Sequence, residues 1–334
     1  MLNAFLQQLI DGKDLTQSQS YTAMQSILQG ENEVQIAALL SLMCARRETA
    51  DEVLGFLKAL SEDMISVPGL TQAIDIVGTG GDGYNTFNIS TAAALLVASC
   101  GVDVVKNGNR AVSSQSGSSD VLSALGCRME LNAKHIMHCV EATHFAFCFS
   151  PQFNPGFAKV KNVRQALGVR TIFNLLGPLL NPAHVNYLLL GVCDEYYQPI
   201  LARALAKTSI QRAMVVTGRG LDEISTVGPV KIIELRDHQL QEWILDPVDY
   251  GFSYCQHPDL KGGDAKQNAK IMLALFEGMH NAITDTVILN AAVALMICGK
   301  ALSIKEGITI AKLHIKNGSA LQTLQRYIEM TQKI

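Results

Sequence analysis

Four glycines occur within residues 78–83, which read GTGGDG. Glycine lets a backbone bend freely and approach a ligand closely. Polar side chains follow at Asn88, Ser90 and Thr91, where an apolar helix is expected to begin and where such side chains would cap its free N–H groups. A helix start is also an anion site, because it combines unpaired N–H donors with the positive end of the helix dipole. These residues predict a site for a phosphate or diphosphate group.

Two basic side chains, Lys106 and Arg110, follow the next expected strand at residues 102–105. The apolar run at residues 73–77, just before the glycine loop, is typical of a buried parallel strand. Both loops then leave the same carboxyl edge of a sheet, where open α/β sheets bind ligands. A glycine loop alone is explained equally well by a tight turn. Its combination with a hydroxyl-rich helix start and a basic loop favours anion binding.

The glycine loop does not fit the two common nucleotide-binding motifs. The three glycines of Gly78-x-Gly80-x-x-Gly83 have the spacing of the dinucleotide fingerprint, but the helix is expected to start only near Asn88. The second strand ends in Lys106, where that fingerprint needs an acidic residue for the ribose. A P-loop is excluded because no Gly-Lys-Ser/Thr follows the glycines.

Two further segments are candidates for anion contacts. Five serines lie within residues 113–119, before a short helix expected at residues 121–125. Capping accounts for one or two of them, so a second hydroxyl-lined anion loop is the preferred interpretation. Residues 151–182 interrupt the alternation of strands and helices and carry the basic side chains Lys159, Lys161, Arg164 and Arg170. Arg164, for example, would reach an anionic ligand, and a solvated basic helix is the equal alternative.

Adjacent carboxylates, Asp222 and Glu223, lie in a glycine-flanked loop after a strand expected at residues 213–217. Magnesium prefers oxygen ligands and is usually held by one or two carboxylates together with substrate phosphates. Because this loop faces the glycine loop at the same sheet edge, a magnesium site is favoured over an exposed acidic turn. The eight cysteines form no CxxC pair and the eight histidines show no paired spacing, so zinc and disulfides are not predicted.

The chain has 334 residues, of which 48% are hydrophobic and 17% charged, and its formal net charge is −3. This length allows one large domain or two of ordinary size. The charge argues against a broad nucleic-acid-binding surface. The longest apolar stretch, residues 286–298, is too short to span a bilayer, and no leader-like segment follows Met1. We expect a cytoplasmic protein that binds neither nucleic acid nor membranes.

Residues 1 to about 70 are expected to be all-helical, because apolar residues recur there at helical spacing. Capping patterns begin two of these helices, at Thr16-x-x-Gln19 and Thr49-x-x-Glu52. The remainder alternates short apolar runs with helical patterns, which is typical of an α/β fold with a mostly parallel sheet. Residues 231–245 predict two strands joined by a turn at Asp237 and His238.

These motifs resemble those of the anthranilate phosphoribosyltransferase family over essentially the whole chain. The matching segments are GTGGD at 78–82, NIST at 88–91, K-x-GNR at 106–110, SS-x-SGS at 113–118, Arg164 with LG-x-RT at 167–171, NLLGP at 174–178 and LDE at 221–223. The resemblance implies the two-domain plan of the nucleoside phosphorylases and phosphoribosyltransferases, with a central mostly parallel sheet in the larger, α/β domain. The helical domain would be residues 1–69 with 163–190 added in space, and the α/β domain residues 70–162 and 191–334. It also implies a homodimer that forms through the helical domain.

The implied reaction transfers the 5-phosphoribosyl group from phosphoribosyl diphosphate to the amine of anthranilate, releasing diphosphate in a step of tryptophan biosynthesis. Mg²⁺ would be the cofactor. The residues show no nucleophile–base pair, and none is required, because positioning and electrostatic stabilisation would supply the catalysis. Lys106, Asn109 and Arg164 would support it.

The family's binding roles carry over position by position. Contacts to phosphoribosyl diphosphate would come from Gly78, Gly81, Asp82, Thr86, Asn88, Ile89, Ser90, Thr91, Lys106, Asn107, Gly108, Asn109, Arg110, Ala111, Val112, Ser113, Ser114 and Ser118. Anthranilate would contact Gly78, Asn109 and Arg164, with Arg164 countering its carboxylate. Ser90, Asp222 and Glu223 would hold magnesium.

Two departures from the family concern the acceptor. Asn107 stands where the family usually has a histidine near the aromatic acceptor, and Thr217 where many members have another histidine. Asparagine keeps hydrogen bonding but lacks the ring and the option of a positive charge. Asn107 therefore predicts altered affinity for anthranilate or use of a related aromatic amine.

Two alternatives to the transferase share parts of this pattern. A pyrimidine nucleoside phosphorylase has the same two-domain plan and a similar glycine loop, but the Asp-Glu pair and the NIST segment favour the transferase. A non-enzymatic relative that binds nucleic acid would need a basic groove, and the net charge of −3 counts against it.

Overall fold

The computed structural model describes residues 2–110 and 115–334. It divides into two compact units, unit 1 with Met1–Ser66 and Ser150–Pro182, and unit 2 with Val67–Phe149 and Ala183–Ile334. These bounds differ from the expected ones, because the inserted segment is Ser150–Pro182 and not 163–190. Residues 183–190 belong to unit 2 since they lead into a strand that is paired on both sides. Residues 150–162 belong to unit 1 because they form short helices there.

Unit 1 is helical throughout its described residues. Its elements are α1 (Leu2–Ile10), α2 (Gln17–Leu28), α3 (Glu33–Arg46), α4 (Ala50–Asp63), α8 (Ser150–Phe153), α9 (Gly156–Lys159), α10 (Lys161–Leu167), α11 (Ile172–Leu176) and the 3-10 turn η1 (Gly177–Leu179). Both predicted capping boxes are formed, by Thr16 at α2 and by Thr49 at α4. The rings of Phe56 and Phe173 pack edge to face at 6.2 Å, which joins α4 to the inserted segment.

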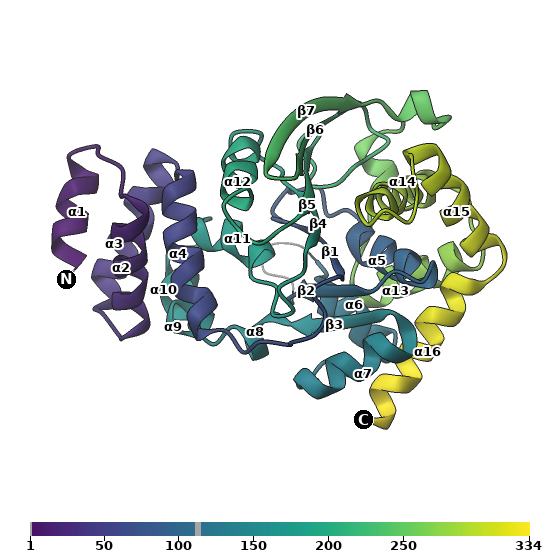
Figure 1. The fold of residues 1–334 in the computed structure, drawn as a ribbon, viewed down its shortest axis with the longest axis horizontal. Coiled ribbons are helices and arrows are strands. Elements are labelled where there is room, and N and C mark those ends of the chain that lie inside the picture. Colours follow the sequence, from purple (N-terminus) through teal and green to yellow (C-terminus); the bar gives the residue numbers. More distant parts are fainter. Residues whose placement is uncertain (1, 111–114) are drawn as a thin grey trace. The chain divides into compact units, whose positions relative to one another are not determined.

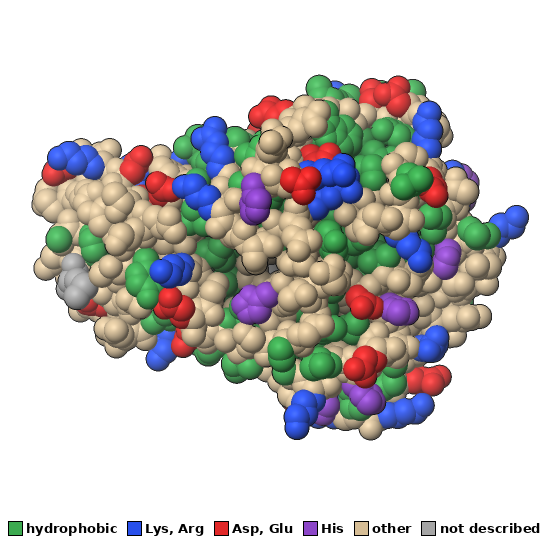
Figure 2. Space-filling model, in the orientation of Figure 1, with side chains coloured by type: hydrophobic (Ala, Val, Ile, Leu, Met, Phe, Trp, Pro, Cys, Tyr) green, Lys and Arg blue, Asp and Glu red, His purple; other side chains and the backbone are tan. Residues whose placement is uncertain are grey.

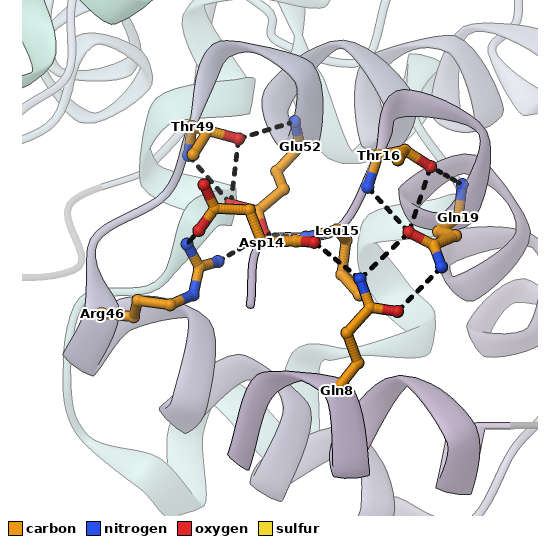
Figure 3. Close-up of polar contacts among 8 residues, drawn as sticks. All are labelled: Gln8, Asp14, Leu15, Thr16, Gln19, Arg46, Thr49 and Glu52. Atoms are coloured by element: carbon orange, nitrogen blue, oxygen red, sulfur yellow. Dashed lines mark hydrogen bonds and ion pairs between the residues drawn. The ribbon is translucent and has the colours of Figure 1, made fainter. Parts of the chain in front are cut away.

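A polar cluster ties the starts of α2 and α4 together (Figure 3). Glu52 is fully buried and accepts hydrogen bonds from the backbone N–H groups of Leu15 (3.0 Å) and Thr49 (2.9 Å). Arg46 pairs with both Glu52 and Asp14. A buried carboxylate is tolerated only when it is paired and hydrogen-bonded. The cluster therefore fixes these two helix starts against each other.

Unit 2 is built on a seven-stranded sheet with the order β3-β2-β1-β4-β5-β6-β7 (Figure 1). The strands are β1 (Ile74–Gly78), β2 (Val104–Gly108), β3 (Phe145–Phe149), β4 (Tyr187–Gly191), β5 (Arg212–Thr217), β6 (Val230–Arg236) and β7 (Gln239–Leu245). Strands β1 to β5 run parallel to one another, and β6 is antiparallel to both of its neighbours, β5 and β7. The predicted mostly parallel sheet is confirmed. Strand order reverses between β1 and β4, which is where open α/β sheets bind ligands.

Helices cover both faces of this sheet. They are α5 (Ile89–Ser99), α6 (Ser118–Ala124), α7 (Ala133–Thr143), α12 (Tyr197–Leu205), α13 (Ala265–Phe276), α14 (Ala282–Ile297), α15 (Ile304–Lys316) and α16 (Ser319–Lys333), with the 3-10 turns η2 (Pro247–Tyr250) and η3 (His257–Leu260). In Figure 1, α5 and α14 lie on one face and α12 on the other. Because both faces are covered, β3, β4 and β5 are almost entirely apolar and buried, whereas β1 and β2 also bury the polar side chains of Asp75, Lys106 and Asn107. None of the helices formed by residues 2–110 and 115–334 has the length and apolarity of a membrane span.

Candidate active site

The glycine loop, the basic loop and the Asp-Glu loop all leave carboxyl ends of parallel strands, as the sequence predicts. Gly78 ends β1 directly opposite Gly191, the last residue of β4. Asp222 lies over this pair so closely that a Cβ on Gly78 would be 2.8 Å from its Cγ, and a Cβ on Gly191 would overlap its carbonyl group. Gly191 therefore requires glycine, a side chain on Gly78 would displace the Asp222 carboxylate, and Asp222 rests directly on the two strand ends.

The two carboxylates join separate parts of this edge. Asp222 Oδ2 accepts a hydrogen bond from the N–H of Gly80 in the glycine loop at 2.6 Å. Glu223 Oε1 accepts one from the N–H of Ser90 in the first turn of α5 at 3.2 Å. Gly80, Gly81 and Gly83 have φ values of 68°, 76° and 79°, which L side chains rarely adopt. The loop conformation that presents the Gly80 N–H to Asp222 thus depends on glycine.

The ionisable groups at this edge shift one another's pKa values. Desolvation and the neighbouring Asp222 carboxylate raise the pKa of Glu223 to about 8, against the opposing effect of Lys106. Lys106 is buried on β2, and its Nζ donates to Ser90 Oγ at 3.2 Å and to the Ile76 carbonyl oxygen. Burial lowers the pKa of Lys106, while nearby carboxylates oppose that shift. Burial and the neighbouring Asp222 carboxylate therefore favour the protonated form of Glu223, and a cation bound beside it would favour the ionised form.

The donor set of this carboxylate pair fits magnesium. Among the described residues, no cluster of three or more His, Cys, Asp and Glu side chains forms a metal site. A metal at this edge would therefore need ligands of other kinds as well. Asp222 and Glu223 offer only oxygen atoms, and Ser90, whose N–H donates to Glu223, adds a hydroxyl oxygen. One or two carboxylates completed by phosphate oxygens and water is the usual magnesium arrangement. The raised pKa of Glu223 is consistent with a buried carboxyl group that a bound cation would stabilise in its ionised form.

Asn88 occupies the N-cap position of α5, but its side chain makes no capping hydrogen bond. Its Oδ1 accepts from Asn268 Nδ2 at 2.8 Å, and its Nδ2 donates to the Ser116 carbonyl oxygen at 3.1 Å. The capping role predicted for Asn88 is therefore wrong. The backbone N–H of Thr91, which an N-cap side chain ordinarily engages, is left to other acceptors.

The basic loop is anchored to the serine-rich segment. The N–H of Ser119 donates to the Asn109 carbonyl oxygen at 3.4 Å, and the N–H of Arg110 to Asn109 Oδ1 at 2.7 Å. A Cβ on Gly108 would lie 3.3 Å from Ser118 Cβ, which places Ser118 beside the end of β2. The predicted contacts Ala111, Val112, Ser113 and Ser114 lie outside the described residues.

Most of the predicted phosphoribosyl-site residues therefore come together in unit 2. The described members at this sheet edge are Gly78, Gly81, Asp82, Thr86, Asn88, Ile89, Ser90, Thr91, Lys106, Asn107, Gly108, Asn109, Arg110, Ser118, Asp222 and Glu223. Asn107 is buried on β2, and its backbone N–H donates to Asp75 Oδ2 at 3.2 Å. Arg164 belongs to unit 1.

Within unit 1, Arg164 differs from its basic neighbours. Its guanidinium lies over the ring of Phe173 at 5.3 Å, and burial lowers its pKa. Lys159, Lys161 and Arg170 are exposed. Exposure of the basic side chain therefore describes those three residues, whereas Arg164 is held on an aromatic surface with its orientation restricted.

The segment from His257 to Asn268 takes part in the site and was missed in the sequence. Thr86 forms a β-bridge with Lys261, the N–H of Phe87 donates to the Leu260 carbonyl oxygen at 2.9 Å, and Asn268 bonds to Asn88. The glycine pair before Asp264 signals a tight turn and a helix start. No local feature of the sequence indicates that Asn88, the partner of Asn268, lies 180 residues earlier in the chain.

Two family models match the chain. Residues 70–321 match the glycosyl transferase family, a/b domain, and residues 3–64 match the glycosyl transferase family, helical bundle domain. The anthranilate phosphoribosyltransferase of Chlamydia felis is 38% identical to this chain, covering 100% of it and 98% of the relative. That of Thermomicrobium roseum is 43% identical, covering 98% and 96%.

Solved structures agree with these relatives. The anthranilate phosphoribosyltransferase of Thermus thermophilus superposes with a TM-score of 0.92 at 35% identity, covering 98% of this chain and 99% of the other. The Saccharomyces cerevisiae enzyme in complex with PRPP and Mg superposes with a TM-score of 0.91 at 29% identity, covering 100% and 98%. The helical bundle match and these superpositions confirm the predicted fold class. The chain belongs to the anthranilate phosphoribosyltransferase family.

Proposed function

We propose that this protein transfers the 5-phosphoribosyl group from phosphoribosyl diphosphate to the amine of anthranilate, giving N-(5-phosphoribosyl)anthranilate and diphosphate. The observation that carries the proposal is the position of the Asp-Glu loop. Asp222 and Glu223 are hydrogen-bonded to Gly80 and Ser90, so carboxylates for a metal adjoin backbone donors for a phosphate. The S. cerevisiae relative has been solved with PRPP and Mg and with 4-fluoroanthranilate, the two kinds of ligand that the proposed reaction requires.

The diphosphate would bind where the glycine loop meets the first turn of α5. Backbone N–H groups of the loop and the positive end of the helix dipole favour an anion there. Lys106 adds a full positive charge beneath Ser90, and it is held in place by two hydrogen bonds. Arg110 and Ser118 would contact the phosphoribosyl end from the basic and serine-rich loops.

Ser90, Asp222 and Glu223 would hold Mg²⁺ together with oxygen atoms of the diphosphate. Bound there, Mg²⁺ would neutralise charge on the leaving group. The protein supplies the geometry, because Gly78 and Gly191 fix Asp222 and the first turn of α5 fixes Glu223. Release of the proton from Glu223, whose pKa is about 8, would accompany metal binding near neutral pH.

The chemistry breaks the bond between the anomeric carbon and the diphosphate oxygen and forms one from that carbon to the anthranilate nitrogen, which loses a proton. The proposal assigns no covalent role to a side chain. Catalysis would come from holding the two reactants in line and from stabilising the charge that leaves with diphosphate. Asn109 and Gly78 would contact the acceptor, and Arg164 would pair with its carboxylate.

We also propose a homodimer that forms through the helical unit. Unit 1 exposes four large apolar side chains, with exposed fractions of 62% at Ile10, 76% at Val34, 53% at Ile65 and 58% at Val169. A second copy of the chain would cover part of this surface. Sedimentation equilibrium of the wild type and of Val34→Lys tests this proposal. A wild type that stays monomeric at micromolar concentration would contradict it.

A cytoplasmic location stays a prediction from the sequence.

The decisive experiment is steady-state turnover with phosphoribosyl diphosphate, Mg²⁺ and anthranilate, followed by the loss of anthranilate fluorescence. Robust turnover is expected. A protein without turnover and without magnesium-dependent binding of phosphoribosyl diphosphate in calorimetry would overturn the proposal. Binding without turnover would direct the search to other aromatic amines, with Asn107 as the first residue to change.

The two alternatives predict different results in simple assays. A nucleoside phosphorylase would cleave pyrimidine nucleosides with free phosphate. A nucleic-acid-binding relative would be retained on DNA in a salt-dependent manner. Figure 2 shows acidic and basic side chains interspersed over the described residues of one face, with no broad basic stripe there. This distribution favours the enzyme over the nucleic-acid binder.

A further inference from the structure

Asn268, the fourth residue of α13, is 1% exposed, and both ends of its side-chain amide are engaged. Its Oδ1 accepts a hydrogen bond from the N–H of Gly263 at 2.7 Å, and its Nδ2 donates to Asn88 Oδ1 at 2.8 Å. Asn88 Nδ2 in turn donates to the Ser116 carbonyl oxygen at 3.1 Å. The bonds run in one direction, from Gly263 through the two amides to Ser116, so each amide is fixed in a single orientation.

This orientation removes Asn88 from the role that its position favours. Asparagine is among the best N-cap residues, because its oxygen accepts the N–H of the second or third helical residue. In α5 that oxygen is occupied by Asn268, and no capping bond is made. The N–H of Thr91 therefore receives no capping bond from Asn88, and that side chain does not cover the positive end of the α5 dipole, which favours an anionic ligand.

The backbone that leads into α13 and Asn268 packs tightly against the backbone just before Asn88. Residues 85–87 run alongside residues 260–262, with a bond from the N–H of Gly262 to the Asn85 carbonyl oxygen at 3.0 Å and a β-bridge between Thr86 and Lys261. A Cβ on Gly262 would lie 2.9 Å from Phe87 Cα. These backbone contacts between residues 85–87 and 260–262 hold the amide of Asn268 at a fixed distance from Asn88.

We propose that Asn268 is a positioning residue for phosphoribosyl diphosphate. It holds the Asn88 amide off the first turn of α5 and against Ser116, which keeps the helix start open to the diphosphate and ties it to the segment that leads into α6. The inference rests on the proposed function, since phosphoribosyl diphosphate is the ligand that the open helix start would receive.

Two variants separate the two bonds of Asn268. Asn268→Asp still accepts the Gly263 N–H but cannot donate to Asn88 Oδ1, so the Asn88 amide is released to turn and cap α5. Asn268→Ala removes both bonds without adding a charge. We expect both variants to bind magnesium–phosphoribosyl diphosphate at least about tenfold more weakly in calorimetry. The KM for phosphoribosyl diphosphate should rise accordingly, while kcat and the KM for anthranilate change by less than about twofold, because the lost contact serves ground state and transition state alike.

A double-mutant cycle tests whether Asn268 acts through Asn88. Because Asn88→Ala leaves no amide that could cap α5, adding Asn268→Ala to Asn88→Ala should change the affinity for the ligand little further. Fold-changes that multiply would show independent roles and would overturn the inference.

Gln198→Ala is the matched control. Gln198 is a fully buried amide that donates to the carbonyl oxygens of Val215 at 2.8 Å and Lys231 at 2.9 Å, and neither acceptor belongs to the proposed site. It should lose thermal stability and keep its affinity for phosphoribosyl diphosphate. Equal weakening in Gln198→Ala and Asn268→Ala would reduce the effect to general destabilisation and overturn the inference.

The same titrations distinguish the two proposals. A wild type that binds phosphoribosyl diphosphate while both Asn268 variants bind it equally tightly refutes the positioning role alone. A wild type that does not bind phosphoribosyl diphosphate in the presence of Mg²⁺ refutes the proposed function, and the positioning role falls with it.

Discussion

Gly191→Ala is expected to remove most of the transferase activity while the fold persists. Gly191 ends β4 beside Gly78, and a Cβ there would overlap the carbonyl group of Asp222. The obstacle is backbone, which cannot rotate away as a side chain would. A Cβ on Gly191 would lie 1.6 Å from the Asp222 carbonyl oxygen, so the Asp222 backbone would have to move by about 2 Å to reach ordinary contact at about 3.5 Å.

The size of the effect follows from that displacement. A misplacement of about 1 Å in a catalytic array costs about 100-fold in rate. We therefore expect kcat/KM for phosphoribosyl diphosphate to fall by at least about 100-fold, which corresponds to about 2.7 kcal/mol of transition-state stabilisation. The concentration of Mg²⁺ needed for half-maximal activity should rise as well, because Asp222 and Glu223 are adjacent and move together.

Gly55→Ala is the control for this experiment. A Cβ on Gly55 would lie 2.4 Å from the carbonyl oxygen of Gln17, so the change forces a backbone clash between α4 and α2 of unit 1 that does not involve the Asp-Glu loop of unit 2. It should lower the thermal midpoint and leave kcat/KM within about threefold of the wild type. If Gly191→Ala also keeps kcat/KM and magnesium dependence within that range, the claim that Asp222 must rest on the two glycines is refuted.

Four further outcomes are expected. Because the pKa of Glu223 is raised from 4.5 to about 8, the metal-free folded protein binds this proton more tightly than the unfolded chain, so its unfolding free energy should fall as pH rises between those values and Glu223→Gln should flatten the fall in urea titrations. Asp222→Asn should cut turnover by about 100-fold at limiting Mg²⁺ with an unchanged circular dichroism spectrum; near-normal turnover would contradict the metal role. Asn107→His should lower the KM for anthranilate by about threefold to tenfold through a ring contact, and a change confined to the KM for phosphoribosyl diphosphate would contradict the acceptor assignment. Glu52→Ala should cost about 3–5 kcal/mol of unfolding free energy, because Arg46 loses its buried partner; a loss below about 1 kcal/mol would show that the cluster is dispensable.

Features encoded by local chemistry could be predicted from the sequence. The capping patterns at Thr16 and Thr49 place the starts of α2 and α4 correctly, because both signals act within three residues. The turn predicted at Asp237 and His238 joins β6 to β7, and both residues have positive φ, 51° and 60°. The glycine loop and the carboxyl-edge position of Asp222 and Glu223 follow from the alternation of strands and helices alone.

The bounds of the two units were harder to predict, for a physical reason. The inserted segment opens with α8 and α9, which have four residues each. One turn of helix is too short to show a 3.6-residue apolar period, so the sequence around residues 150–160 carries no clear helical signal. The expected start at residue 163 comes from the family resemblance, and no local pattern moves it to Ser150.

The contacts that complete the candidate site join distant parts of the chain. Gly80 bonds to Asp222, Ser90 to Glu223 and Asn88 to Asn268, across 142, 133 and 180 residues. Pattern reasoning detects donors and acceptors at each end but cannot pair them, because nothing in the local spacing encodes the partner.

Two of these contacts nevertheless leave a local irregularity at the glycine-loop end. Gly80 adopts a left-handed conformation, and Asn88 makes no capping bond although its position favours one. Local rules are usually broken where a function requires it. An N-cap asparagine without a capping bond, directly after a glycine loop, therefore indicates a helix start reserved for a ligand, which is the property that the Asn268 variants test.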